Sequence, residues 1–254
     1  MEQIKRNYVL EQSDEQLIED AIRGMVSSLD NQSRYLNHEE LAAFENAATS
    51  PVTGTRAFQI STLPSGYTYL DIDFFYLSIS EAVQKELEKK NNKGLIIDLR
   101  DNGGGFLEAA VALTDLFVDE GLIVHSRGRT AEANRYYNST ETTPFRQLPV
   151  VILVNEITAS ASEIMAAAMQ DHKRAIIIGT NTYGKGSVQS LIYTDIGAIQ
   201  ITTSMNYRPS GEVIHTSGVR PDIEVLPNQG AEASIGASEQ PANALVEEAI
   251  RTFF

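Results

Sequence analysis

The chain is organised around the stretch VILVNEITASASEIMAAAMQDHKRAIIIGTNTYGKGSVQ, Val151 to Gln189. It starts as an apolar run typical of a buried strand, turns into a small-residue helix, and returns as a second apolar run. The turn offers a serine where a helix N-terminus presents backbone N–H groups, and glycines leave a following lysine free of neighbouring side chains. These features single out Ser160 and Lys185 as candidate catalytic residues.

Composition narrows the classes of protein. The 254 residues, 42% of them apolar, suffice for one large domain with an ordinary core. No cysteine is present, which excludes disulfides, thiolate metal sites and a cysteine nucleophile but leaves the compartment open. The net charge of −14 disfavours binding to nucleic acid and to anionic lipid surfaces.

The N-terminus, MEQIKRNYVLEQ, lacks the hydrophobic core of a signal peptide, and no apolar run is long enough to span a bilayer. We therefore expect either a cytosolic protein or a mature segment without its leader.

Patterning along the chain predicts four regions. Residues 1–46 read as a helical region, and 47–56 as a small, polar linker interrupted by Pro51 and Gly54. Residues 57–228 alternate strands and helices, with 134–143 as a polar excursion. Residues 229–254 predict a mobile polar segment followed by an amphipathic helix from Pro241.

Hydroxyl groups crowd the central turn at Thr158, Ser160 and Ser162. Taken alone, such residues before an alanine-rich helix are most often caps and small packing residues. Position favours Ser160 only in part, because the Ala161 amide is well placed to bind an oxyanion formed at that serine.

The spacing G-x-x-x-x-G-K ending at Lys185 also fits a phosphate-binding loop. However, Gly186 stands where the metal-binding Ser or Thr belongs, and 187–194 alternate like a strand rather than opening a helix. We therefore reject nucleotide binding.

A Ser-His-Asp arrangement is the other rival, but none of the histidines lies in a motif. We expect structural roles for them, and His172 falls at a helix end, where a cation is favoured. No histidine cluster, H-E-x-x-H or recognisable carboxylate pair indicates a metal, and no cofactor is expected. The four histidines of the chain are His38, His125, His172 and His215.

Several motifs together resemble the carboxyl-terminal processing proteases, or tail-specific proteases, which are serine peptidases with a Ser-Lys pair. LDNQSRYL resembles the family's L-D-P-H-S-x-Y-L, and GLIIDLRDNGGG resembles G-L-I-L-D-L-R-x-N-P-G-G. The likeness continues through GLIVHSRGR, NEITASASEIMAAAMQDHKRA, GTNTYGKGSVQS, ITTSMNYRPSGEVI and GVRPDIEV, and so covers nearly the whole chain.

The resemblance implies an α/β core of repeated strand-strand-helix units. It implies that Ser160 is the nucleophile, Lys185 the general base and Gln189 the residue that holds the lysine amine. It further implies an oxyanion hole formed by Ala161 with Gly104 or Gly105. A lysine accepts a proton only when its amine is neutral, a form that burial favours. The expected reaction is peptide-bond cleavage through an acyl-enzyme.

Other expectations also rest on this resemblance. We expect the substrates to be proteins or peptides that are cut in unstructured or C-terminal segments. We also expect an adaptor or regulatory protein as partner and a periplasmic or cell-envelope location. Apolar residues on the terminal helices favour a homo-oligomer. The alternative is a catalytically silent peptide-binding scaffold of the same fold.

The sequence departs from the family in three places. Asn31-Gln32 replaces the usual Pro-His, and Gly103 replaces the proline of N-P-G-G, which removes a restriction on the backbone. A PDZ domain of about 80 residues, which the family places before the D-L-R strand to bind substrate tails by strand addition, has only 47–56 in its place. We expect this domain to be naturally absent or deleted.

Overall fold

The computed structural model describes residues 1–49, 58–90, 92–226 and 244–253. Its contacts group into two units, one of Met1–Gly54 with Ser187–Ser204 and one of Thr55–Gly186 with Met205–Phe254. The boundaries of the four predicted regions stay predictions. Most of the linker and the whole polar segment at 229–239 lie outside the described residues. No helix in the described ranges is long and apolar enough to cross a membrane.

The first unit holds the N-terminal helices and a small antiparallel sheet. Ser13 accepts a hydrogen bond from the Gln16 N–H at the start of α2, as expected of an N-cap. Helices are α1 (Glu2–Asn7), α2 (Asp14–Ser27) and α3 (His38–Thr49); strands are β1 (Arg34–Leu36), β9 (Ser187–Thr194) and the first part of β10 (Gly197–Tyr207). Both β1 and β9 pair with β10.

A six-stranded sheet forms the centre of the second unit, in the order β11-β8-β7-β4-β3-β2. Only β2 runs antiparallel to its neighbour; the other pairs are parallel. The strands are β2 (Phe58–Thr62), β3 (Thr68–Ile72), β4 (Leu95–Asp98), β7 (Val150–Val154), β8 (Ala175–Gly179) and β11 (Ile223–Glu224). Short apolar runs such as VVILV are buried throughout, as parallel strands covered on both faces require.

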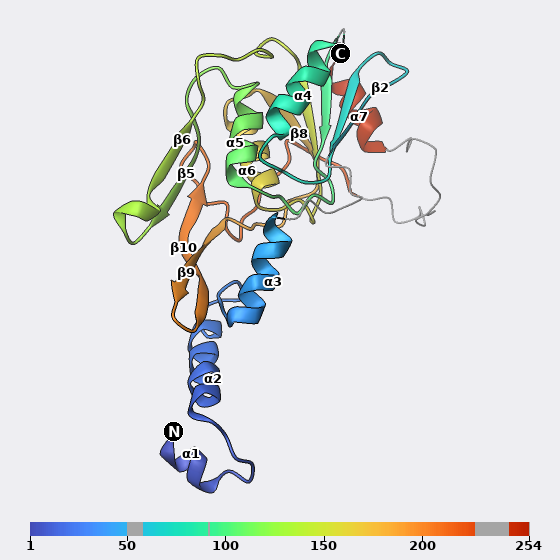
Figure 1. The fold of residues 1–254 in the computed structure, drawn as a ribbon. Coiled ribbons are helices and arrows are strands. Elements are labelled where there is room, and N and C mark those ends of the chain that lie inside the picture. Colours follow the sequence, from blue (N-terminus) through green and yellow to red (C-terminus); the bar gives the residue numbers. More distant parts are fainter. Residues whose placement is uncertain (50–57, 91, 227–243, 254) are drawn as a thin grey trace. The chain divides into compact units, whose positions relative to one another are not determined.

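Helices cover both faces of this sheet (Figure 1). Alternate strand residues such as Ile97 and Ile152 pack with α4 (Ile79–Glu88), α5 (Leu107–Asp115) and α6 (Ala161–Asp171). Their sequence neighbours, among them Ile96 and Val151, pack with α7 (Ala244–Thr252) on the opposite face. The predicted α/β class is confirmed.

One strand was not predicted from the sequence. The excursion at 134–143 contains strand β6 (Arg135–Asn138), which pairs antiparallel with β5 (Leu122–Gly128) after a short 3₁₀ turn at Ala131–Ala133. The polar sequence hid this strand because three of its four side chains are exposed and only pairing with β5 reveals it.

Candidate active site

The candidate residues follow neighbouring parallel strands at their carboxyl ends. The glycine loop, residues 99–106, follows β4. The serine turn, residues 155–160, follows β7, and the lysine loop, residues 180–186, follows β8. Since β7 pairs with β4 on one side and β8 on the other, the three loops are adjacent. The carboxyl edge of an open parallel sheet is where such folds bind ligands.

Ser160 lies at the start of α6 in a strained conformation, with φ of 59° and ψ of −118°. A non-glycine residue with positive φ is uncommon and persists only where its surroundings hold it. The side chain is half-buried. The Ala161 N–H beside it is the first amide of α6, and the described part of the chain offers it no hydrogen-bond acceptor.

The glycine loop packs directly against this turn. A Cβ on Gly104 would lie 2.8 Å from Ser160 Cβ and 2.9 Å from Ala161 N, so only glycine fits here. The Gly104 N–H, however, donates to Asn102 Oδ1 at 2.8 Å. The Gly105 N–H has no acceptor among the described residues.

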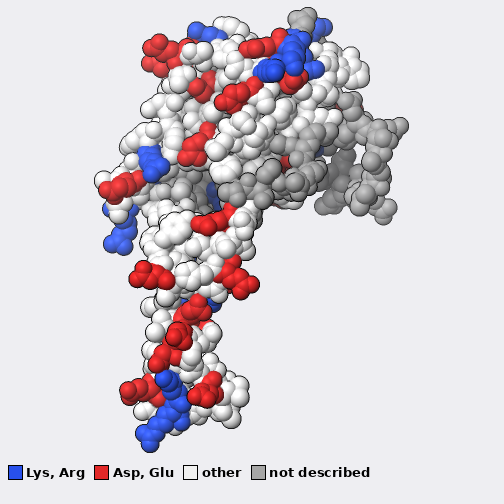
Figure 2. Space-filling model, in the orientation of Figure 1, with Lys and Arg blue, Asp and Glu red and all other residues white. Residues whose placement is uncertain are grey.

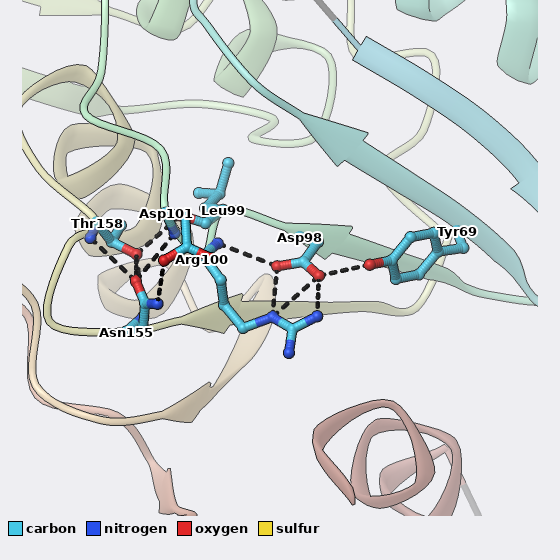
Figure 3. Close-up of polar contacts among 7 residues, drawn as sticks. All are labelled: Tyr69, Asp98, Leu99, Arg100, Asp101, Asn155 and Thr158. Carbon is cyan, nitrogen blue, oxygen red and sulfur yellow. Dashed lines mark hydrogen bonds and ion pairs between the residues drawn. The ribbon is translucent and has the colours of Figure 1, made fainter. Parts of the chain in front are cut away.

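Polar contacts join the glycine loop to the serine turn (Figure 3). Asn155 accepts the Asp101 N–H at 3.0 Å and donates its amide to the Asp101 carboxylate at 2.9 Å. The Thr158 hydroxyl donates to Leu99 O at 2.8 Å. The Asn102 carbonyl accepts the Ala159 N–H at 3.0 Å.

Just before this loop, Asp98 is buried between Arg100 and Tyr69 (Figure 3). Arg100 Nε donates to Asp98 Oδ1 at 2.9 Å, and the Tyr69 hydroxyl also donates to this carboxylate. Burial, with the adjacent Asp98 charge, raises the pKa of Tyr69 well above its ordinary range. The D-L-R segment therefore fixes the end of β4 with a neutralised, hydrogen-bonded group.

Lys185 is half-buried and follows Gly184, whose φ is +87°. Its backbone N–H donates to Glu163 Oε2, whereas no hydrogen bond joins Lys185 Nζ to Ser160 Oγ in the described structure. Strand β9 follows at Ser187, and because no helix begins here, the rejection of a phosphate-binding loop is supported.

Gln189 belongs to the first unit, where its amide donates to Ser187 Oγ at 3.0 Å and Thr202 Oγ1 at 3.2 Å. Its predicted contact with Lys185 stays a prediction. Among the rival residues, His172 ends α6 and its Nε2 lies 2.7 Å from Leu122 O, a structural contact. The described residues include no cluster of three or more His, Cys, Asp or Glu able to hold a metal.

Glu163 is a site residue that the sequence analysis did not single out. It is fully buried in the first turn of α6, and its carboxylate accepts hydrogen bonds from both the serine turn and the lysine loop. The pattern S-x-x-E at Ser160 signals a capping box, which could have drawn attention to it.

This fold and the loops at its carboxyl edge define a class of α/β protein with a serine at a strained strand-to-helix turn. Residues 66–225 match Peptidase family S41, and because this span is more than half of the chain, the chain belongs to that family. The resemblance inferred from the sequence motifs is confirmed.

Similar proteins carry matching names. The carboxy-terminal-processing protease of Bartonella bacilliformis is 41% identical over 163 residues, covering 62% of this chain and 38% of that protein. The solved photosystem II D1 C-terminal processing protease has a TM-score of 0.62 at 30% identity, covering 70% of this chain and 50% of that one. The chain thus spans half or less of the length of these two relatives.

The carboxy-terminal processing protease CtpA of Bacillus subtilis is 27% identical over 315 aligned residues, which cover 88% of this chain and 67% of that protein. The alignment is longer than the 254-residue chain itself. The relative therefore carries additional residues within the matched span.

Proposed function

We propose that this chain is a serine endopeptidase that cleaves unstructured or C-terminal segments of proteins through an acyl-enzyme. The observation that carries the proposal is the meeting of the serine turn with the glycine loop and the lysine loop at one edge of the sheet. Ser160 would attack the peptide carbonyl, and Lys185 would take up the serine proton and then activate water.

Two amide donors would stabilise the tetrahedral intermediate. The Ala161 N–H is one of them, and its lack of an acceptor supports this role. Of the two candidate glycines, Gly105 has an N–H with no acceptor in the described ranges, whereas the Gly104 N–H would first have to leave Asn102. Gln189 would hold the Lys185 amine once substrate binds, because catalytic hydrogen bonds often tighten only in the substrate complex.

Exposed apolar side chains near Ser160 support a polypeptide substrate. Each of the four loops that follow β3, β4, β7 and β8 exposes at least one large apolar side chain. Such side chains would pack against an extended peptide laid across the carboxyl edge. They are Phe74, Leu77, Phe106, Ile157 and Tyr183.

We also propose, on the family resemblance, a periplasmic or cell-envelope location and an adaptor or regulatory protein as partner. We further propose that no PDZ domain precedes the D-L-R strand, and the short interval at 47–56 supports this. Cell fractionation with an antibody against this chain tests the location.

The proposed reaction is tested by cleavage of fluorescein-labelled casein with Ser160→Ala and Lys185→Ala. We expect each variant to lose about 10³-fold or more in kcat, because nucleophile and base act as one unit. A fluorophosphonate should label wild-type Ser160, located by mass spectrometry.

Lys93→Ala is the matched control, since Lys93 is exposed just before β4, at the opposite end of that strand from the glycine loop. It should cleave like the wild type. Full cleavage by both catalytic-site variants would refute the assignment, and a wild type that binds peptides yet neither cleaves nor labels would favour the silent scaffold.

A further inference from the structure

Glu163 is a buried carboxylate without a cationic partner. Its side chain is fully inaccessible, and no ion pair involving it exists among the described residues. Burying an isolated anion costs several kcal/mol unless hydrogen bonds compensate. The hydrogen-bond partners of Glu163 therefore indicate which segments it positions.

Four hydrogen-bond donors surround the carboxylate. Oε2 accepts the Ser160 N–H at 2.9 Å and the Lys185 N–H at 2.8 Å. Oε1 accepts the Gly184 N–H at 2.7 Å and the Thr182 hydroxyl. One oxygen atom therefore binds the backbones of both proposed catalytic residues.

A capping box explains only part of this arrangement. Such a box accounts for the bond from Glu163 to the Ser160 N–H three residues earlier. The other three donors come from the loop after β8, 19 to 22 residues further along the chain. A helix cap has no need of that loop.

The serine turn and the lysine loop each need a restraint from another part of the chain. Ser160 has a positive φ that a non-glycine residue keeps only when its surroundings impose it. The lysine loop includes Gly184, whose φ of +87° lies in the region that glycine favours, and its shape is free to vary unless its amides are bonded.

We propose that Glu163, as an anion, is the positioning residue that sets Ser160 and Lys185 relative to each other. This inference rests on the proposed function. All four partners donate hydrogen, so only a deprotonated carboxylate can accept from all of them. Loss of its charge would loosen the serine turn and the lysine loop together.

Glu163→Gln tests the proposal with almost no change in side-chain volume. The NH₂ group of glutamine replaces one carboxylate oxygen and cannot accept hydrogen bonds. The two donors that were bonded to that oxygen therefore lose their acceptor. We expect kcat on casein to fall about 10²-fold, the scale of a small misplacement of reacting groups. KM should stay unchanged, and the rate of fluorophosphonate labelling at Ser160 should fall in parallel.

Asp115→Asn is the matched control. The Asp115 carboxylate at the end of α5 likewise accepts a backbone N–H and a hydroxyl, both from Thr140, at 2.6 and 2.8 Å. We expect it to keep wild-type kcat and labelling rate. A folded Glu163→Gln protein with wild-type kcat and labelling rate overturns the inference.

If Glu163→Gln does not fold, Thr182→Val and Thr182→Ser decide. Valine removes the hydroxyl that donates to Glu163 and accepts the Val219 N–H, whereas serine keeps both bonds. Thr182→Val should therefore lose more kcat and labelling than Thr182→Ser. Equal values for these two variants overturn the inference. Failure of the proposed function is distinct, because Ser160→Ala would then retain cleavage whatever Glu163 does.

Discussion

At the scale of single residues, the candidate site depends on one glycine as much as on its reactive side chains. Gly104 has a φ of +106° and lies where any side chain would strike Ser160 and the Ala161 amide. The adjacent Gly103 is exposed, and a Cβ there would meet no atom within 4 Å. The structure thus has no room for a side chain at Gly104 but has room for one at Gly103.

Gly104→Ala and Gly103→Ala should therefore differ sharply. We expect Gly104→Ala to abolish casein cleavage and lower the free energy of unfolding by about 1–3 kcal/mol, because strain adds to the clash. Gly103→Ala should stay within about 1 kcal/mol of the wild type and remain active.

Urea unfolding and kcat/KM measure the two effects. An active Gly104→Ala protein would contradict the close contact between the glycine loop and the serine turn.

At the scale of elements, the β5–β6 hairpin holds a histidine in an aromatic stack. The His125 ring lies between Tyr136 and Tyr207, at centroid distances of 5.2 and 5.0 Å. Neither of its nitrogens has a hydrogen-bond partner in the described structure. Burial, together with the nearby Arg127 guanidinium, lowers the pKa of His125.

This lowered pKa predicts loss of stability in acid. The unfolded histidine takes up a proton near pH 6.5. The folded ring does so only at lower pH, so the His125 contribution is complete above about pH 6.5 and declines as pH falls below it. His125→Phe should keep the stack and flatten the decline in unfolding free energy between pH 7.5 and 5.5.

Exposed His38 provides the control, and His38→Gln should leave that pH dependence unchanged. Urea unfolding at the two pH values of that interval measures the change in the free energy of unfolding. A decline in His125→Phe as steep as in the wild type would show that other groups cause the acid sensitivity.

For the molecule as a whole, the N-terminal helices and the segment between α1 and α2 leave apolar side chains uncovered. Helix α1 buries no residue, and α2 buries only Val26. Acidic groups are distributed over these helices, with basic groups at α1 and uncharged surface among them (Figure 2). Ile4, Tyr8, Val9, Leu10 and Met25 are at least half exposed.

We expect these residues to form a homo-oligomer contact, because burying them against a second copy removes apolar surface from water. The double substitution Val9→Gln with Leu10→Gln should shift sedimentation velocity profiles toward the monomer. Ile192→Gln, an exposed apolar residue of β9, should leave the profile unchanged. A wild type that is monomeric at the highest soluble concentration would contradict the contact.

The amino-acid sequence was enough to predict the family, the α/β class, most helices and strands, and Ser160 and Lys185 as candidates. These features depend on local periodicity, caps and motif spacing. Strand β6 was not predicted because its residues are polar, and only its pairing with β5 identifies it as a strand.

Which loops meet depends on how the strands pair and the helices pack. The contacts of Thr158 with Leu99 and of Ser162 with Asn102 join residues 59 and 60 positions apart, and sequence spacing says nothing of them. The Glu163 carboxylate is likewise an ordinary helix cap in the sequence. It becomes the shared acceptor for Ser160 and Lys185 because parallel pairing of β7 with β8 brings the lysine loop over the first turn of α6.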